Sequence, residues 1–433
     1  MDIELLYLLI ILGVFLVSAA YYRLPIGLAM FLSALAGAIA YGIGTPDQLL
    51  QIPKHLVDGS FGYIDPVITI AAAMVFMKFI TAGGALDAFS VLVVEKLNRR
   101  PTLLLISFML VLMFPAMITG SSVTSVVSAG ALIAPTLRSM GIPKKETAGI
   151  VVAGSIFGMI APPINLPVMI IADIVDMPYI GFTLPLFILT VPLAIFSVLY
   201  LGLKYVKDLD MKELHTKLHF GIKNEVNGFV YLPLILLIVL MVVINVFPSF
   251  LPPLGLPLVF IIPTIFACFV GKKFSAILQA KEAIRTALPV MGILFGVGMF
   301  IQILTLTGAR GYIVYNIMSL GQVTIGQHPI FLYLGSVTLI PLFGAFSPFG
   351  SSSIFGGPFV IALIFLNPIV VASALSLLTG VGDFIPPSVV ALHSSQIVKV
   401  DRYGPVLKKL AVPIIVTVLY TLVYMILLGM FWN

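Results

Sequence analysis

Charged residues are scarce in this sequence. Asp, Glu, Lys and Arg together make up 9% of 433 residues, whereas hydrophobic residues make up 60%. Soluble domains carry about 25% charged residues, and the mean hydropathy here is +1.18. A chain with so few charges cannot cover a water-facing surface, so most of its exterior must face lipid.

Cysteine and the common catalytic motifs are also almost absent. The single cysteine, Cys268, permits neither a disulfide framework nor a cysteine metal site. No His-Glu-x-x-His and no Gly-x-Ser-x-Gly occurs, which argues against a membrane protease or another enzyme. The net charge of +6 comes from short basic loops, which set membrane topology. We therefore expect no nucleic-acid partner and no bound organic cofactor.

Long charge-free stretches predict the fold class. Each approaches or exceeds the roughly 20 residues that cross a bilayer as a helix, and backbone hydrogen bonding in lipid requires helices. The sequence therefore predicts an all-α polytopic protein of an inner membrane. The clearest such stretches are Leu5–Tyr22, Leu24–Pro46, Thr147–Ala172, Met177–Leu203, Thr286–Ala309 and Leu410–Asn433.

Three short motifs occur in the same order in both halves of the chain. Gly84 and Gly308 are 224 residues apart, as are Pro162 and Pro386. Gly120 and Gly350 are 230 apart, which requires a six-residue insertion and a later deletion of the same length. The paired motifs are Thr81–Ala85 with Thr305–Ala309, Gly120–Ser122 with Gly350–Ser353, and Ala161–Ile164 with Ile385–Ser388.

The charges indicate that the two halves lie in opposite orientations. Basic clusters at 96–100 and 138–145 flank the first Gly-Ser motif, whereas only Arg310 lies in the matching part of the second half. After the Pro-Pro motifs the pattern reverses, with acidic residues at 173–176 and basic residues at 399–409. Short cytoplasmic loops are rich in Lys and Arg. Inverted repeats of this kind are typical of secondary transporters.

These patterns divide the chain into five parts. Each repeat is expected to contain a re-entrant helical hairpin and a helix broken by Pro-Pro, with the hairpin tips at Gly120–Ser122 and Gly350–Ser353. The predicted parts are N-terminal scaffold helices (1–62), a first inverted repeat (63–203; hairpin 102–137, broken helix 147–172), a cytoplasmic linker (204–227), scaffold helices with an amphipathic arm (228–288) and a second inverted repeat (289–433; hairpin 330–366, broken helix 370–398).

The hairpin tips are the first candidate ion site. Glycine permits a sharp turn, and hydroxyls with freed carbonyls offer the oxygen ligands that Na⁺ prefers. Close helix packing through small residues is the alternative. The candidate ligands are Gly120, Ser121, Ser122, Thr124, Gly350, Ser351 and Ser352.

The Pro-Pro motifs are the second candidate site. Proline lacks an N–H and frees carbonyls one turn back, so the broken helix ends could bind a cation or an anion. A simple kink is the alternative. Pro162, Asn165 and Pro386 are candidate ion ligands. The candidate substrate contacts are Ser122, Pro163, Asn165, Ser352, Ser353 and Ser388.

Asp383 is the most informative single residue. It lies three residues before Pro386 in an otherwise apolar segment. An acidic side chain at membrane depth is costly and usually functional, so Asp383 could bind Na⁺ or carry a proton. A solvated position at the interface is the alternative. We expect Lys78 and Arg310 to reach toward an interface rather than bind substrate.

At these motifs the sequence resembles the large membrane subunit of TRAP (tripartite ATP-independent periplasmic) transporters, within the wider ion transporter superfamily. Two segments carry the resemblance, Gly120–Thr124 and Gly154–Asn165, and it extends over essentially the whole chain. The resemblance implies an elevator-type permease that moves a small carboxylate, such as a C4-dicarboxylate or a sugar acid. It also implies coupling to a Na⁺ gradient, with H⁺ as an alternative.

The resemblance implies two protein partners as well. A periplasmic binding protein would deliver the substrate, and a small four-helix membrane subunit, expected as a separate chain, would brace the large one. A self-sufficient ion-coupled anion carrier or antiporter of the same superfamily remains the alternative.

Overall fold

The protein is described by a computed structural model that covers residues 2–97, 100–206, 228–246, 254–322 and 329–431. Across these ranges the regular elements are helices, and there is no strand. Within the described residues, seven helices are long and apolar enough to cross a membrane, by length and composition. The chain is therefore a multi-pass membrane protein, as the charge-free stretches predicted.

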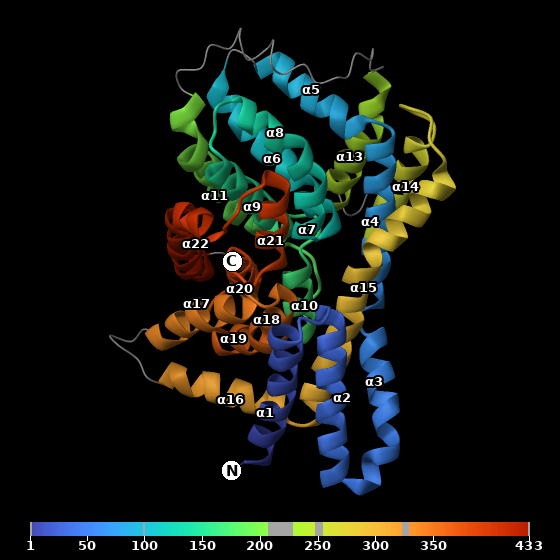
Figure 1. Cartoon of the computed structure of the whole chain (residues 1–433). Helices are drawn as coiled ribbons and strands as arrows, with labels where there is room; N and C mark the ends of the chain where they lie inside the picture. Colours follow the sequence, from blue (N-terminus) through green and yellow to red (C-terminus); the bar gives the residue numbers. More distant parts are fainter. Residues whose placement is uncertain (1, 98–99, 207–227, 247–253, 323–328, 432–433) are drawn as a thin grey trace.

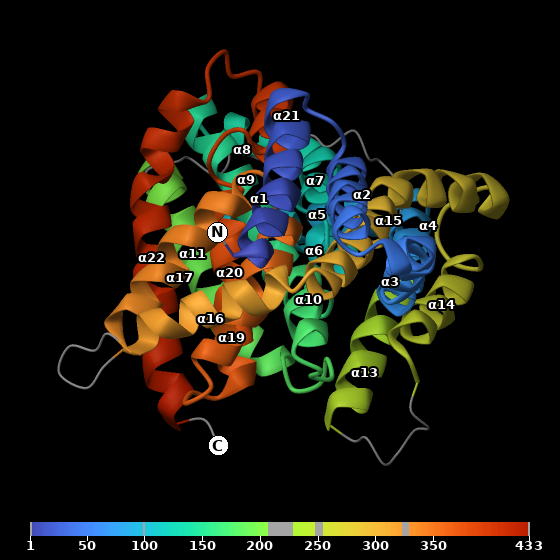
Figure 2. The ribbon, with the colours of Figure 1, turned by 90° about the horizontal axis from the view of Figure 1, so that it is seen from below.

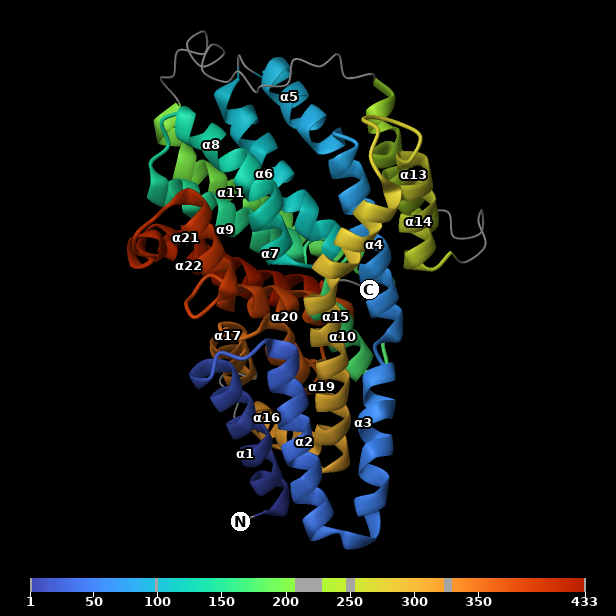
Figure 3. The ribbon, with the colours of Figure 1, turned by 45° about the vertical axis from the view of Figure 1, so that its right-hand side comes forward.

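One group of long helices forms the part that we call the scaffold (Figures 1 and 3). α15 packs along α2, α3 and α4. A Cβ at Gly27 would lie 2.5 Å from the Gly292 carbonyl oxygen, and one at Gly298 would lie 2.0 Å from that of Gly59. Such backbone-to-backbone approach is how membrane helices pack tightly. The scaffold helices are α1 (Ile3–Leu16, extended by a π-helical turn, Val17–Tyr21), α2 (Ile26–Gly44), α3 (Ile52–Phe61), α4 (Ile64–Ala82), α13 (Leu232–Val246), α14 (Leu256–Ala267) and α15 (Ala276–Leu306).

Two runs of helices repeat the same order. Each run has a long helix, a short arm, a helical hairpin, a broken helix and a final long helix. The first run continues from α4 with α5 (Ala85–Leu97), α6 (Pro101–Thr119), α7 (Ser122–Ser125), α8 (Ala131–Ser139), α9 (Lys144–Ile160), α10 (Leu166–Ile174) and α11 (Thr183–Val206). The second continues from α15 with α16 (Ala309–Gln322), α17 (Ile330–Gly344), α18 (Pro348–Ser351), α19 (Gly357–Ala362), α20 (Pro368–Gly382), α21 (Val389–Val398) and α22 (Gly404–Phe431).

The two runs point in opposite directions. α4 ends beside α5 at the top of Figure 1, whereas α15 ends beside α16 at the bottom. Gly84 and Gly308 have φ angles of 83° and 73° where each long helix turns into its arm. Glycine adopts this left-handed conformation without steric cost. The equal spacing of these glycines in the sequence therefore marks equivalent turns of two inverted units.

Each hairpin packs on its own broken helix through a glycine. A Cβ at Gly158 of α9 would lie 2.4 Å from the Met113 carbonyl oxygen of α6. A Cβ at Gly382 of α20 would lie 2.2 Å from the Gly344 carbonyl carbon of α17. These two glycines are 224 residues apart, like the Pro-Pro motifs. The two hairpins and two broken helices, which we call the hairpin domain, are thus joined in the same way in both repeats.

The predicted position of the second hairpin tip is wrong. The second arm of hairpin 1 begins after Ser121 and that of hairpin 2 begins after Ser347, 226 residues later. The π-helical turns that follow, Val126–Gly130 and Ser352–Gly356, keep this spacing. Gly350–Ser353 therefore lies inside the second arm of hairpin 2 and not at its tip. In both hairpins a serine precedes the second arm, because its hydroxyl caps the first free N–H groups. The spacing of these serines exceeds the 224-residue spacing of the repeats by two, so the insertion is two residues and not six.

Two further predictions concern connecting segments. Residues 276–288 of the predicted amphipathic arm are not a separate helix, because α15 continues through them without a break. α22 and the pair α13–α14 lie at opposite edges of the molecule (Figure 2). Most of the predicted linker 204–227 lies outside the described residues.

Candidate functional site

The tip of hairpin 1 is anchored to the first helix break. Gly120 has a φ angle of 64°, and a Cβ there would lie 2.7 Å from Leu166 Cγ. The Ile164 N–H donates to the Met117 carbonyl oxygen at 3.1 Å. The Ser121 hydroxyl accepts from the Thr124 N–H at 3.3 Å. Gly120 and Ser121 therefore shape and cap the tip.

Asn165 closes the first break. Its Oδ1 accepts from the Val168 N–H at 3.0 Å, and its Nδ2 donates to the Ile160 carbonyl oxygen at 2.8 Å. Nδ2 also donates to Ser376 Oγ of α20 at 3.0 Å, which links the two broken helices. The amide is fully buried. In this conformation Asn165 holds the broken ends together, and both polar atoms of its side chain are hydrogen-bonded within the protein.

Asp383 joins the first hairpin tip to the second break. It follows the last residue of α20, and 7% of it is exposed. Its Oδ1 accepts from the Ser388 hydroxyl at 3.1 Å and its Oδ2 from the Ser122 hydroxyl at 3.3 Å. No ion pair to Asp383 occurs within the described ranges. A buried carboxylate without a counter-charge is strongly unfavourable, so this site favours a bound cation or a proton.

The serines of the second motif bond within hairpin 2. Ser351 donates to the Ile340 carbonyl oxygen at 2.7 Å and so ties the two arms together. Ser352 and Ser353 donate to the carbonyl oxygens one turn back, at 2.8 and 2.7 Å. The equivalent of Ser351 in hairpin 1 is Ser125, which donates to the Leu112 carbonyl oxygen. These hydroxyls hold the hairpins in shape.

A cavity of about 680 Å³ lies between the scaffold and the hairpin domain. Sites for small organic ligands have volumes of roughly 300–1,000 Å³. The scaffold wall comes from α2, α4 and α15, and the facing wall from both hairpin tips, Asp383 and the start of α21. Lys78 and Asp383 are the charged residues in this lining. The polar groups on the hairpin side are Ser121, Ser122, Thr124, Ser128 and Ser347.

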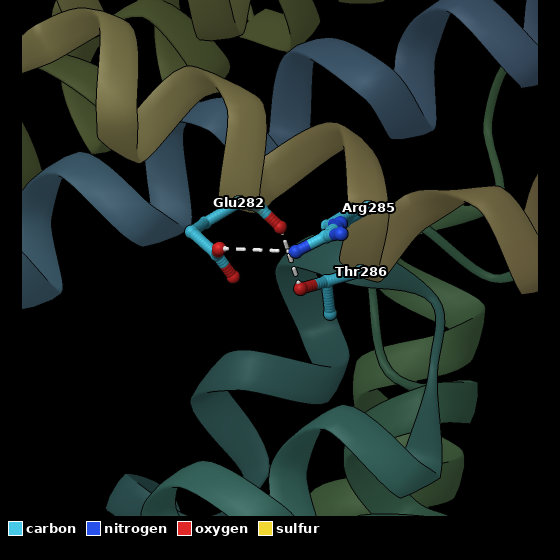
Figure 4. A network of polar contacts seen from close by, with 3 residues as sticks. All are labelled: Glu282, Arg285 and Thr286. Atoms are coloured by element: carbon cyan, nitrogen blue, oxygen red, sulfur yellow. Dashed lines mark hydrogen bonds and ion pairs between the residues drawn. The ribbon is translucent and has the colours of Figure 1, made fainter.

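One edge of the cavity is formed by the first half of α15. Thr286 lines the cavity, but its hydroxyl donates to the Glu282 carbonyl oxygen at 2.8 Å (Figure 4). Glu282 forms a 3.8 Å ion pair with Arg285 beside it. Both side chains are exposed, and such pairs contribute about 0–1 kcal/mol. Glu282 and Arg285 lie outside the cavity lining, so their ion pair supports the helix. Lys78 is the positively charged residue of the lining.

The structure brings together only part of the predicted set. Ser121, Ser122, Thr124 and Asp383 line the cavity. Ser388 lies outside the lining but contacts Asp383. The residues outside both groups are Gly120, Pro162, Pro163, Asn165, Gly350, Ser351, Ser352, Ser353 and Pro386.

The sequence reasoning missed several lining residues, among them Ser128, Ser347 and Lys78. Ser347 lines the cavity, and its hydroxyl accepts from the Gly350 N–H at 3.1 Å. The pair Ser347-Pro348 is a helix-start signal that could have located this tip. Lys78 lies in the cavity wall although the sequence suggested an interfacial position.

Solved transporter structures share this fold. The chain matches *Neisseria gonorrhoeae* MtrF, described with a class of antimetabolite efflux pumps, with a TM-score of 0.62 and 14% identity. The match covers 87% of this chain and 84% of that one. It also matches the *Alcanivorax borkumensis* YdaH transporter, with a TM-score of 0.57, 15% identity and 87% coverage of each chain. The fold is therefore that of a helical membrane transporter.

Sequence comparison identifies the family. Residues 11–431 match the model of the tripartite ATP-independent periplasmic transporter, DctM component. The chain belongs to this family and is a large permease component of a TRAP transporter, as the motifs predicted.

Two characterised relatives share parts of the sequence. A segment of 141 residues is 31% identical to the isethionate TRAP transporter permease protein DctMQ of *Oleidesulfovibrio alaskensis* (33% of this chain, 21% of the relative). A segment of 206 residues is 27% identical to the Na(+)/H(+) antiporter NhaC of *Bacillus subtilis* (46% of this chain, 44% of the relative). The matched segments thus span less than half of either relative.

Proposed function

We propose that this permease carries a small organic anion across a bacterial or archaeal inner membrane and couples the movement to a Na⁺ gradient. The observation that carries the proposal is Asp383, buried between the Ser122 and Ser388 hydroxyls beside a cavity of about 680 Å³. Hard cations prefer carboxylate and hydroxyl oxygens. A cation at Asp383 would neutralise the carboxylate and add positive charge next to the space where an anion would bind.

The anion class follows from charge and size. The cavity has apolar walls, a few hydroxyls, Lys78 and Asp383. With a cation on Asp383 the lining would carry a net positive charge, which suits a small carboxylate or sulfonate. One relative is named for isethionate, a sulfonate, and the resemblance to TRAP permeases favours C4-dicarboxylates and sugar acids.

The movement is proposed to be an elevator motion of the hairpin domain against the scaffold. Glycine contacts between backbones fix the helices within each part, such as Gly27 on Gly292 and Gly158 on Met113. Across the boundary the contacts of Gly350 are with side chains, Phe15 and Met30. A boundary made of side chains can slide with less disruption than one where backbones touch.

We also propose that the permease acts in a tripartite assembly with two partner proteins. A periplasmic binding protein would deliver the anion, and a small four-helix membrane subunit would bind the scaffold. The test is uptake of labelled succinate and isethionate into proteoliposomes containing the chain and the small subunit. Uptake should require both an inward Na⁺ gradient and the binding protein.

A self-sufficient carrier is the second candidate, and the partial match to NhaC favours it. Uptake by the chain without a binding protein would support it and overturn the tripartite proposal. Equal uptake under a H⁺ gradient with no Na⁺ would instead assign a proton to Asp383.

A further inference from the structure

Lys78 is placed where a charged side chain needs a partner. It lies in α4, is half-buried and lines the cavity between the scaffold and the hairpin domain. No ion pair or hydrogen bond of its side chain occurs within the described part of the chain. Its neighbours in the lining from α4 are Met74, Met77 and Thr81. An ammonium in such an apolar wall favours a negative partner.

Asp383 is the other charged residue of the lining, and it is already engaged. Two hydroxyls donate to its carboxylate from the hairpin domain, and among the described residues no ion pair joins it to Lys78 in the scaffold wall. The cavity thus has one charge of each sign on walls that belong to different parts of the molecule. An anion and a cation bound together would satisfy both.

We infer that the Lys78 ammonium binds the anionic group of the substrate from the scaffold side of the cavity. This inference rests on the proposed function and adds a residue that the motifs did not indicate. A lysine is a compact charge on a flexible stem and can follow a carboxylate or sulfonate without a fixed geometry. Ser121 and Thr124 line the facing wall, from which the hairpin domain would complete the site.

The position of Lys78 also indicates in which conformation of the protein it would contact the substrate. Lys78 belongs to the scaffold, so it would contact the substrate only while the cavity lies against this part of α4. Thr81 and Ser128 extend the lining from the tips toward α5 and the arms of hairpin 1. The basic loops lie on that side, which the positive-inside rule assigns to the cytoplasm. Lys78 would therefore bind the anion in the conformation described here, next to the cytoplasmic exit.

The cavity charge can be measured without knowing the substrate. Cys268 is the only cysteine of the chain, so Cys268→Ser with Ser128→Cys places a single thiol in the lining. The full chain in nanodiscs is treated with an anionic reagent, sulfonatoethyl methanethiosulfonate, and with a cationic one, trimethylammonioethyl methanethiosulfonate. The ratio of the two reaction rates should fall on the order of tenfold with Lys78→Gln. The wild-type ratio should be retained with Lys78→Arg. It should also be retained with the matched control Lys54→Gln, since the Lys54 side chain is exposed on α3.

Uptake then tests binding of the substrate itself. In proteoliposomes with the small subunit and binding protein, Lys78→Gln should raise the KM at least tenfold for whichever of succinate or isethionate is carried. Lys78→Arg should restore most of the affinity, and Na⁺-dependent thermal stabilisation should not change.

Two results would overturn the inference. An unchanged rate ratio in Lys78→Gln would show that the ammonium extends to the interface and leaves the cavity. An unchanged KM would show that it lines the cavity without binding substrate. Wild-type uptake that ignores Na⁺ would instead contradict the proposed function, while a changed rate ratio would still place the charge of Lys78 in the cavity.

Discussion

At the scale of the residue, Asp383 connects structure and coupling. Its carboxylate is reached by hydroxyls from hairpin 1 and from the second helix break. A cation bound there would hold these two elements together, so its loss would loosen the hairpin domain as well as stop coupling.

Asp383→Asn removes the negative charge and keeps the shape of the side chain. We expect the Na⁺ concentration for half-maximal thermal stabilisation to rise at least about tenfold, because a charged ligand is lost. The measurement is thermal unfolding in detergent with NaCl or KCl. Asp65→Asn, an exposed carboxylate in the first turn of α4, is the matched control. Full Na⁺ stabilisation in Asp383→Asn would place the ion elsewhere.

Gly158→Ala tests the close packing of hairpin 1 on α9. The added Cβ would lie 2.4 Å from a backbone oxygen, so the helices must separate. We expect a loss of about 1–3 kcal/mol in stability, measured as a lower thermal unfolding midpoint. Gly13→Ala in α1, where a Cβ meets nothing within 4 Å, should be neutral or slightly stabilising. An equal effect of both changes would argue against this packing.

At the scale of the element, sequence motifs located the helix breaks better than the second hairpin tip. α9 ends at Ile160 and α20 at Gly382, shortly before Pro162-Pro163 and Pro386-Pro387, because proline cannot continue the hydrogen-bond pattern. Gly350–Ser353 resembled Gly120–Ser122 in composition but lies within a helix. Small residues serve both tips and packed helices, so composition alone could not distinguish the two roles, whereas the cap at Ser347 could.

Ser347→Ala tests the revised tip of hairpin 2. The change removes the hydroxyl that accepts from the Gly350 N–H, and losing such a cap costs about 1 kcal/mol. We expect slower Na⁺-driven uptake, because Ser347 also lines the cavity. Thr338→Ala on the exposed face of α17 is the control. A larger loss in Ser352→Ala than in Ser347→Ala would return the tip to the second motif.

At the scale of the whole molecule, the inverted repeat was predictable because the distribution of charged residues and the spacing of the glycines both indicate it. The cavity was not, since its scaffold wall combines α2 with α4 and α15. The motif that α4 and α15 share, Thr81–Ala85 and Thr305–Ala309, does not indicate that these helices meet the hairpin tips. Lys78 illustrates the limit. The sequence places it in an apolar span, and only the packing of α4 against the hairpin tips shows which side it faces.

The inverted arrangement predicts opposite accessibility for the two arms. In a Cys268→Ser background, Lys96→Cys on α5 and Tyr315→Cys on α16 each present one exposed thiol. An impermeant maleimide should label Tyr315→Cys in right-side-out vesicles and Lys96→Cys in inside-out vesicles. Labelling of both in the same preparation would contradict the inverted topology.

The central claim is that the coupling ion binds at Asp383, between the two inverted units. Cryo-electron microscopy of the chain with its small subunit, in NaCl and in choline chloride, tests this most directly. The account predicts density coordinated by Asp383, Ser122 and Ser388 in NaCl only, beside a cavity open between the scaffold and the hairpin tips. Identical maps in both salts, with Asp383 holding only its two hydroxyl partners, would contradict it.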